Sequence, residues 1–259
     1  MAEQVFAGRT VIVTGSAGGI GSAIVEAFAQ GGATVIAADL MDSAATAEEV
    51  PDSDGKGRVV RHQLDVSCER SWIALMDIVD AQFGGLDVLV NNAGIYRPNI
   101  PFEDMELATW REHFAVNADG TFLGCKHAIR RMKARGCQGA VVNIGSGMSI
   151  SASPTGAAYC GSKAAVLMTT KTAARAAGQY GIRINAVLPG AVETSMLMGN
   201  MTGDDDKEGF LSRMESFSAL GKLAHARDIA EAVLFLAGDR SSAISGVAIP
   251  VDGGAIPGA

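Results

Sequence analysis

The stretch RTVIVTGSAGGIGSAIVEAFAQ, residues 9–30, decides the fold. A run of β-branched residues leads into a glycine-rich turn, and the turn opens an alanine-rich helical pattern. Such a turn lets backbone N–H groups and a helix N-terminus face a pyrophosphate with no side chain in the way. The glycine spacing is G-x-x-x-G-x-G, and a tight turn without a ligand is the alternative. The place of the turn between the first strand and the first helix favours a dinucleotide site, with contacts from Gly15, Ser16, Gly19, Ile20 and Gly21.

Short β-branched runs and longer helical patterns alternate through the rest of the chain. Strands are expected at 33–39, 58–64, 86–91, 140–145, 183–188 and 246–251, and helices at about 67–83, 107–135, 156–179 and 227–238. Near-continuous apolar strands separated by helices indicate a parallel sheet covered on both faces. We therefore predict an α/β fold, a Rossmann-like doubly wound parallel sheet of about seven strands that forms a single domain over residues 1–259.

Two stretches interrupt this alternation. Ser43–Gly57 is polar and is expected to be a surface excursion. Residues 194–218 carry several methionines and an acidic centre. Because a connection of that length is usually functional, we expect it to be a lid over the substrate.

Composition excludes several classes of protein. With 48% hydrophobic and only 19% charged residues, disorder is not expected. The 32 glycines have no period of three, which excludes a collagen-like chain, and a net charge of −7 argues against a nucleic-acid partner. Four cysteines without a CxxC pair indicate free thiols, and four histidines without ligand spacing give no reason to expect a metal. With no signal-peptide pattern and no apolar run of about 20 residues, a cytoplasmic protein without a membrane partner is expected.

Asp39 stands at the end of the second expected strand, 18 residues after Gly21. A carboxylate there accepts hydrogen bonds from the adenosine ribose hydroxyls and repels a 2′-phosphate. No arginine or lysine in the glycine turn or directly after Asp39 offers a partner for such a phosphate. NAD is therefore expected rather than NADP, although an aspartate that only caps a turn is the alternative.

Tyr159 and Lys163 lie four residues apart, on one face of the helix expected at 156–179. An ammonium group beside a phenol favours the phenolate, so Lys163 is expected to lower the tyrosine pKa from its usual value of about 10. A surface pair is the alternative, since Y-x-x-x-K is common by chance. The pair follows a strand that ends at Ser146, which favours a ligand site because ligands bind at the carboxyl edge of a parallel sheet.

In this order and spacing, the chain resembles the short-chain dehydrogenases/reductases over essentially its whole length. The matching elements are the TGxxxGxG turn at Thr14–Gly21, the acidic selector Asp39, the adenine-contacting Asp65-Val66, the NNAG element Asn91–Gly94, the catalytic Asn117 and Ser146, the tyrosine motif at Tyr159–Lys163, and the nicotinamide-backing Pro189-Gly190 with Thr194. One departure is Gly161, where the family often has alanine. The resemblance places NAD against Gly15, Ser16, Gly19, Ile20, Gly21, Asp39, Leu40, Asp65, Val66, Asn92, Ala93, Gly94, Tyr159, Lys163, Pro189, Gly190, Val192 and Thr194.

The resemblance also implies a mechanism, hydride transfer between a secondary alcohol carbon and nicotinamide. Tyr159 is expected to take the hydroxyl proton, and Ser146 to donate a hydrogen bond to the substrate oxygen. Lys163 is expected to hold the nicotinamide ribose. Asn117 is expected to position a water that links Lys163 to solvent.

The expected function is that of an NAD(H)-dependent oxidoreductase that interconverts a secondary alcohol and a ketone. The substrate is expected to be apolar or cyclic, since methionines suit an adaptable apolar pocket, and ordinary core methionines are the alternative. The substrate site is expected to consist of Ser146, Met148, Tyr159, Tyr96 and Met196.

Three other functions agree less well with the sequence. A 3-oxoacyl thioester reductase of lipid metabolism usually takes NADP, so Asp39 argues against it. A non-catalytic NAD-binding regulator generally lacks the tyrosine or the lysine, and enoyl reductases space that pair more widely. By resemblance, a homotetramer is expected, packed through the helices near 107–135 and 156–179 and through the C-terminal strand.

Overall fold

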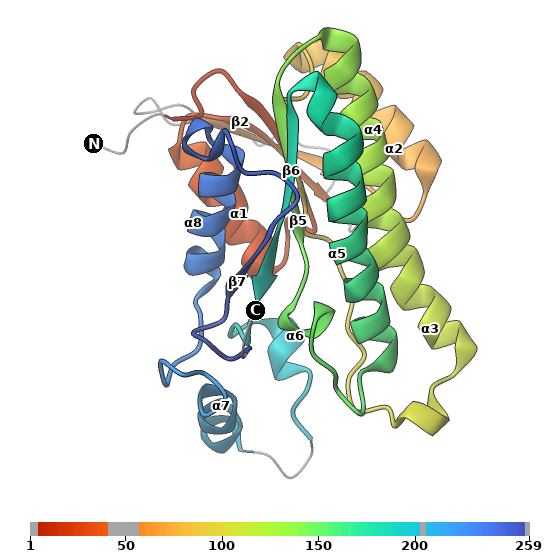
Figure 1. The fold of residues 1–259 in the computed structure, drawn as a ribbon, viewed down its shortest axis with the longest axis vertical. Helices are drawn as coiled ribbons and strands as arrows, with labels where there is room; N and C mark the ends of the chain where they lie inside the picture. The colour runs from red at the N-terminus through yellow and green to blue at the C-terminus, as the bar shows by residue number, and fades with distance from the viewer. Residues whose placement is uncertain (1–4, 41–56, 203–205, 257–259) are drawn as a thin grey trace.

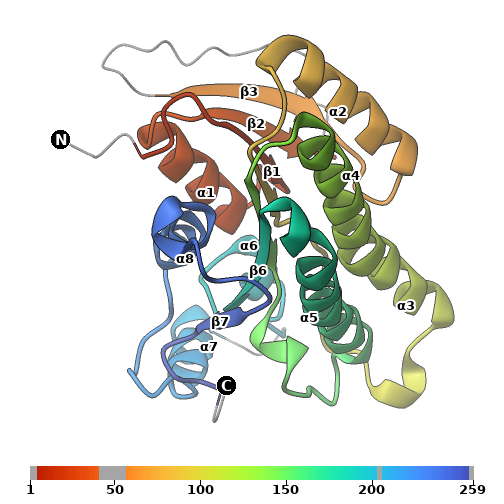
Figure 2. The same ribbon diagram turned by 45° about the horizontal axis from the view of Figure 1, so that its top comes forward.

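In a computed structural model of the chain, which describes residues 5–40, 57–202 and 206–256, seven strands form one parallel sheet. The strands are β1 (Thr10–Thr14), β2 (Thr34–Asp39), β3 (Arg58–Gln63), β4 (Val88–Asn91), β5 (Gly139–Ile144), β6 (Ile182–Pro189) and β7 (Ala248–Val251). Their order is β3-β2-β1-β4-β5-β6-β7 (Figures 1 and 2). The chain moves outward from β1 to β3 and then returns to pair β4 with β1, as in Val13↔Val90. This reversal opens a crevice at the carboxyl ends of β1 and β4.

Helices cover both faces of the sheet (Figure 2). They are α1 (Gly19–Gln30), α2 (Glu69–Phe83), α3 (Leu107–His113), α4 (Gly120–Arg135), α5 (Ala157–Ala177), α6 (Ser195–Met198), α7 (Lys207–Glu215) and α8 (Ala226–Ala237). The core on one face is formed with α1 and α8, and the core on the other face with α2, α4 and α5. The predicted doubly wound parallel sheet is confirmed.

The central strands are apolar throughout because both of their faces are covered. In β1, all five residues are buried, and Val11, Ile12 and Val13 have no exposed surface. Alternate side chains of a strand point to opposite faces. Ile12 therefore packs into the core beside α2, whereas Val11 and Val13 pack into the core beside α1.

The helix expected at 107–135 is continuous but not uniform. Its middle, η2 (Phe114–Asp119), is a π-helical segment between α3 and α4. Single π-turns inside α-helices are uncommon and frequently occur at functional sites. This one contains Asn117, which is fully buried.

The stretch at 194–218 contains α6 and α7, which lie beyond the carboxyl edge of the central strands (Figure 1). Phe210 of α7 is buried. Residues 203–205 of this stretch, and all of the expected polar excursion except Gly57, lie outside the described residues. Among the residues that are described, no helix combines the length and apolarity needed to cross a membrane.

Candidate active site

The glycine turn after β1 has no room for side chains. Gly15 has a φ of +63°, and a Cβ on it would lie 2.7 Å from the Cα of Ala93. A Cβ on Gly21 would lie 2.0 Å from the carbonyl oxygen of Gly15, and one on Gly19 would lie 2.8 Å from the Cγ2 of Thr194. Glycine is therefore required at all three positions, and the pyrophosphate site predicted for this turn stays a prediction.

Thr14 and Asn92 hold this turn against the end of β4. The Asn92 Nδ2 donates to the carbonyl oxygens of Thr14 and Gly15, at 3.0 and 2.9 Å. The Thr14 Oγ1 accepts from the backbone N–H groups of Asn92 and Ala93, each at 3.0 Å. The role of the Thr14 hydroxyl was not predicted, although a threonine directly before the turn was the available signal.

Asp39 ends β2 beside the glycine turn, and its Oδ2 accepts from the backbone N–H of Ala17 at 2.9 Å. Leu40, which follows, is exposed. The carboxylate of Asp65 accepts from the N–H and the hydroxyl of Ser67, at 2.9 and 2.6 Å, and these bonds stabilise the turn at residues 65–67. The neighbouring Val66 is buried and packs against α4 at Gly120.

The chain after β6 borders the same edge of the sheet. Pro189 is the last residue of β6, and a Cβ on Gly190 would lie 2.7 Å from the Cβ of Asp252. Val192 is buried and pairs with Ala224 in an isolated bridge. Thr194 caps α6 and is the side chain that touches Gly19. Of the predicted residues of this segment, Thr194 therefore reaches the glycine turn.

Ser146, Tyr159 and Lys163 meet where β5 ends and α5 begins. Ser146 follows β5, and its Oγ accepts from the N–H of Met148 at 3.1 Å. The Ser146 side chain lies close enough to Tyr159 to act on the pKa of the phenol, which it lowers. Lys163, one turn along α5, donates to the carbonyl oxygen of Ile144 at 2.8 Å, and its Nζ lies 5.7 Å from the centroid of the Tyr159 ring.

The pKa of Tyr159 differs from the expectation. Burial raises this pKa to about 12, and the Ser146 side chain opposes the rise only in part. Burial also lowers the pKa of Lys163 to about 8. The expected lowering of the tyrosine pKa by Lys163 is wrong for this geometry, because the lysine Nζ is directed to Ile144 and burial is the largest influence on the phenol.

The side chain of Asn117 connects three segments of the site. Its Oδ1 accepts from the N–H of Ile95 at 2.8 Å, and its Nδ2 donates to the Ile95 carbonyl at 3.0 Å and to the Ser162 Oγ at 2.9 Å. The side chain thus binds protein groups through both its oxygen and its nitrogen. Gly94 fits closely here, because a Cβ on it would lie 3.2 Å from the Asn117 Oδ1 and 3.3 Å from the Lys163 Nζ.

Of the residues predicted to hold the substrate, Tyr96 packs its ring against that of Tyr159. The centroids of the Tyr96 and Tyr159 rings are 4.5 Å apart, and the ring planes are tilted by 35°. Met148 lies in the short turn directly after Ser146. Met196 lies on a separate element, α6, where it is 41% exposed.

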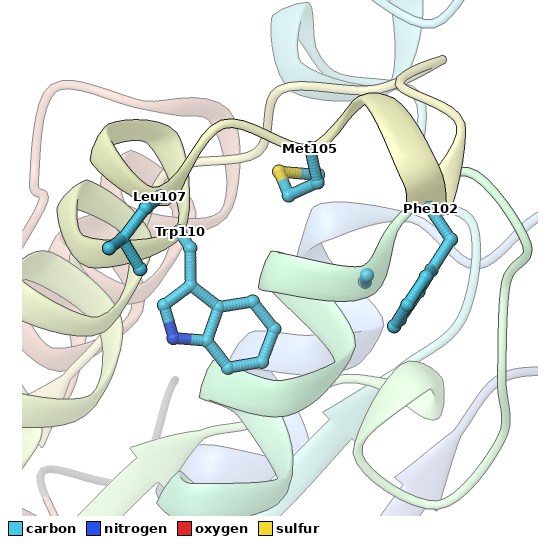
Figure 3. A pocket seen from close by; sticks show the side chains of 5 residues that line it. Phe102, Met105, Leu107 and Trp110 are labelled. Carbon is cyan, nitrogen blue, oxygen red and sulfur yellow. The ribbon is translucent and has the colours of Figure 1, made fainter.

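An apolar hollow of about 220 Å³ lies between α3 and the start of α5 and is lined by Phe102, Met105, Leu107, Trp110 and Ala157. Figure 3 shows Trp110 and Phe102 on either side of it, with Met105 between them. None of these residues belongs to the predicted site. At the departure Gly161, a Cβ would make a close contact of 3.0 Å with the Trp110 ring.

Comparisons with known proteins agree with this geometry. A family model described as enoyl-(acyl carrier protein) reductase matches residues 15–255. The chain is 38% identical to cis-4-hydroxycyclohexanecarboxylate dehydrogenase of Sinomonas cyclohexanicum, over 97% of this chain and 98% of that protein. It is also 38% identical to 2,5-dichloro-2,5-cyclohexadiene-1,4-diol dehydrogenase of Sphingobium indicum, over 95% and 96% of the two chains.

A solved structure described as ribose-5-phosphate isomerase from Brucella melitensis 16M has the same fold. Its TM-score is 0.87 at 36% sequence identity, and the match covers 97% of this chain and 94% of that one. The family match and the dehydrogenase relatives both extend over nearly the whole sequence. This chain therefore belongs to the short-chain dehydrogenase/reductase family, and it is an oxidoreductase that uses a nicotinamide cofactor to interconvert a secondary alcohol and a ketone.

Proposed function

We propose that this protein is an NAD-dependent dehydrogenase for a secondary hydroxyl group on an apolar cyclic substrate. One observation carries the proposal, the grouping of Ser146 directly after β5 with Tyr159 and Lys163 of α5, where the Lys163 Nζ reaches the carbonyl oxygen of Ile144 at 2.8 Å. This edge of a doubly wound sheet is where ligands bind. Enoyl reduction, which the description of the family model names, is not favoured by a tyrosine and a lysine only four residues apart.

In this proposal each catalytic side chain has a separate task. Tyr159 accepts the hydroxyl proton of the substrate during oxidation, and Ser146 donates a hydrogen bond to the same oxygen as charge develops on it. Lys163 binds the ribose of the cofactor. Asn117 fixes the backbone of Ile95 against α5 through Ser162. The nicotinamide, when bound, takes up or supplies the hydride.

The choice of NAD over NADP rests on Asp39. Its carboxylate lies at the end of β2 and accepts a hydrogen bond from the glycine turn at Ala17. A 2′-phosphate next to this carboxylate would bring two like charges together in a crevice, where their repulsion is stronger than in water. We therefore assign the adenosine ribose hydroxyls of NAD to Asp39 and Leu40, and the adenine to Asp65 and Val66.

The proposed substrate class rests on the apolar groups around the tyrosine. The ring of Tyr96 lies 4.5 Å from that of Tyr159, and Met148 follows Ser146 in the chain. We propose that residues 194–218, which include Met196, close over this side as a lid. Both dehydrogenase relatives described above are named for hydroxyl groups on six-membered carbon rings, and that fits a flat apolar site.

We also propose a single-domain cytoplasmic protein that assembles as a homotetramer. Phe122 of α4 and Met168 of α5 are large apolar side chains, 52% and 59% exposed, on the helices that the family resemblance assigns to the interface. Such residues become buried when copies associate. The four cysteines are free thiols, which fits a reducing compartment.

The proposal is tested by assaying the purified protein with NAD and with NADP on a panel of cyclic secondary alcohols. We expect turnover with NAD, which Tyr159→Phe abolishes while the Kd for NAD stays within about threefold. Tyr180→Phe is the matched control, because Tyr180 packs against Lys133 outside the site. Turnover by Tyr159→Phe would overturn the mechanism. Activity only on acyl thioesters with NADPH would favour the thioester reductase, and NAD binding without any turnover would favour the regulator.

A further inference from the structure

Side chains of one helix hold the backbone on both sides of Tyr96. Asn117 makes two hydrogen bonds to Ile95, as described above. One turn earlier, the His113 Nε2 accepts from the backbone N–H of Arg97 at 3.1 Å. Because residues four apart share a helix face, Asn117 and His113 together form a short ladder of hydrogen bonds along residues 95–97.

The state of His113 follows from its two hydrogen bonds. The side chain is fully buried, and its Nδ1 lies 2.8 Å from the carbonyl oxygen of Thr109. A carbonyl only accepts, so Nδ1 carries the proton, and Nε2 is left as the acceptor that the N–H of Arg97 requires. The neutral imidazole is therefore matched to both of its partners.

A second contact holds the same segment more weakly. The Arg97 guanidinium pairs with the Glu112 carboxylate at 2.9 and 2.6 Å. The two side chains are 56% and 44% exposed, and ion pairs with that exposure contribute little. The buried hydrogen bond to His113 is therefore the stronger restraint on Arg97.

We propose that His113 is a positioning residue for Tyr96. By holding the N–H of Arg97, it keeps the Tyr96 ring against Tyr159, where the centroids are 4.5 Å apart. The inference rests on the proposed function, in which Tyr96 forms one wall of the substrate site. Without the acceptor, the N–H of Arg97 loses its partner and the backbone that carries Tyr96 is held only on the Ile95 side, by Asn117, so the ring is held less firmly while Ser146 stays in place. Substrate binding therefore suffers more than the chemical step.

Two substitutions of His113 separate positioning from packing. His113→Gln keeps an acceptor oxygen close to the position of Nε2, whereas His113→Leu keeps only the bulk. We expect His113→Leu to raise KM for a cyclic alcohol about tenfold, as loss of one buried hydrogen bond implies, and to leave kcat within about threefold. His113→Gln restores KM, and Glu112→Gln, which breaks the exposed pair, changes KM by less than about twofold. Equal KM values for the Leu and Gln variants, or a fall in kcat alone, overturn the proposal.

Amide hydrogen exchange tests the same role without turnover. We expect the Arg97 amide to exchange at least about tenfold faster in His113→Leu, at the wild-type rate in His113→Gln, and the amides of β5 to be unchanged in both. Unchanged exchange in the Leu variant overturns the proposal. Faster exchange in a protein that turns over no cyclic alcohol leaves the positioning role standing and refutes the proposed function. If His113→Leu does not fold, His113→Asn, whose amide is too short to reach Arg97, replaces it with the same expectations.

Discussion

Replacing Lys163 with methionine should stabilise the folded protein at neutral pH. Burial lowers the pKa of Lys163 from 10.5 to about 8, so at pH 7 the fold holds an ammonium ion that would be better solvated in the unfolded chain. At 1.36 kcal/mol per pKa unit, this costs about 3 kcal/mol. Methionine has a similar length and no charge, but it gives up the hydrogen bond to Ile144, which is worth about 1 kcal/mol. Lys163→Met should therefore raise the free energy of unfolding by about 2 kcal/mol at pH 7.

The pH dependence of that difference provides the test. Because the pKa is lower in the folded chain, the unfolded chain binds more protons between about pH 8 and 10.5, and wild-type stability rises with pH in this window. The advantage of Lys163→Met should shrink by about 1 kcal/mol between pH 7 and pH 9. Urea unfolding of both proteins, at one protein concentration and up to pH 9, measures the difference in their free energies of unfolding. Groups that titrate in the same way in both proteins do not contribute to this difference. Above pH 10 the raised pKa of Tyr159 makes the folded chain bind more protons than the unfolded chain, so this group lowers stability as the pH rises. A variant that is less stable than wild type at pH 7, or an advantage that does not change with pH, would refute the reasoning.

Three other substitutions test separate parts of the structure. Asp39→Ala should raise the ratio of kcat/KM for NADP to that for NAD by about tenfold, since it removes one repulsion, and an unchanged ratio contradicts the role of this carboxylate. Arg183→Met should lower the free energy of unfolding by about 2 kcal/mol, since Arg183 donates to the carbonyls of residues 236–238 at the end of α8, and an unchanged urea midpoint contradicts this. Gly161→Ala should change stability by less than about 1 kcal/mol, because the better helix propensity of alanine offsets a close contact with Trp110, which borders a hollow. A fall of more than about 2 kcal/mol in urea unfolding would show that the Trp110 ring cannot move.

The sequence predicted the sheet well because the signal for a buried parallel strand is local. The apolar run of β1 was expected at residues 9–14 and is found at Thr10–Thr14, and the helix expected at 156–179 is α5 at Ala157–Ala177. The sequence also indicated which positions must be glycine, since the atom closest to a Cβ on Gly21, the carbonyl oxygen of Gly15, lies within the same turn. The helices α6 and α7 inside residues 194–218 were not predicted, because each is short and weakly patterned.

Contacts between residues distant in the chain could not be read from the sequence. Arg183 caps the end of α8 from more than 50 residues away, and Thr14 binds the N–H groups of residues 92 and 93 across the sheet. His113 had no local signal either, because its partner Arg97 lies in a loop without periodicity. In each case a side chain satisfies a backbone group of another element, which only the folded arrangement brings into reach.

The pKa values of the catalytic pair show where spacing alone gives the wrong answer. A spacing of four positions puts Tyr159 and Lys163 on one face of α5, but the direction of the lysine Nζ is decided by the carbonyl of Ile144 at the end of β5. Both groups are buried, so desolvation disfavours the phenolate and the ammonium alike. A buried tyrosine ionises more easily when a further positive charge comes close to it. With no such charge from outside the protein, Tyr159 stays protonated at neutral pH. Because oxidation of the alcohol needs the phenolate, the rate of oxidation should rise with pH.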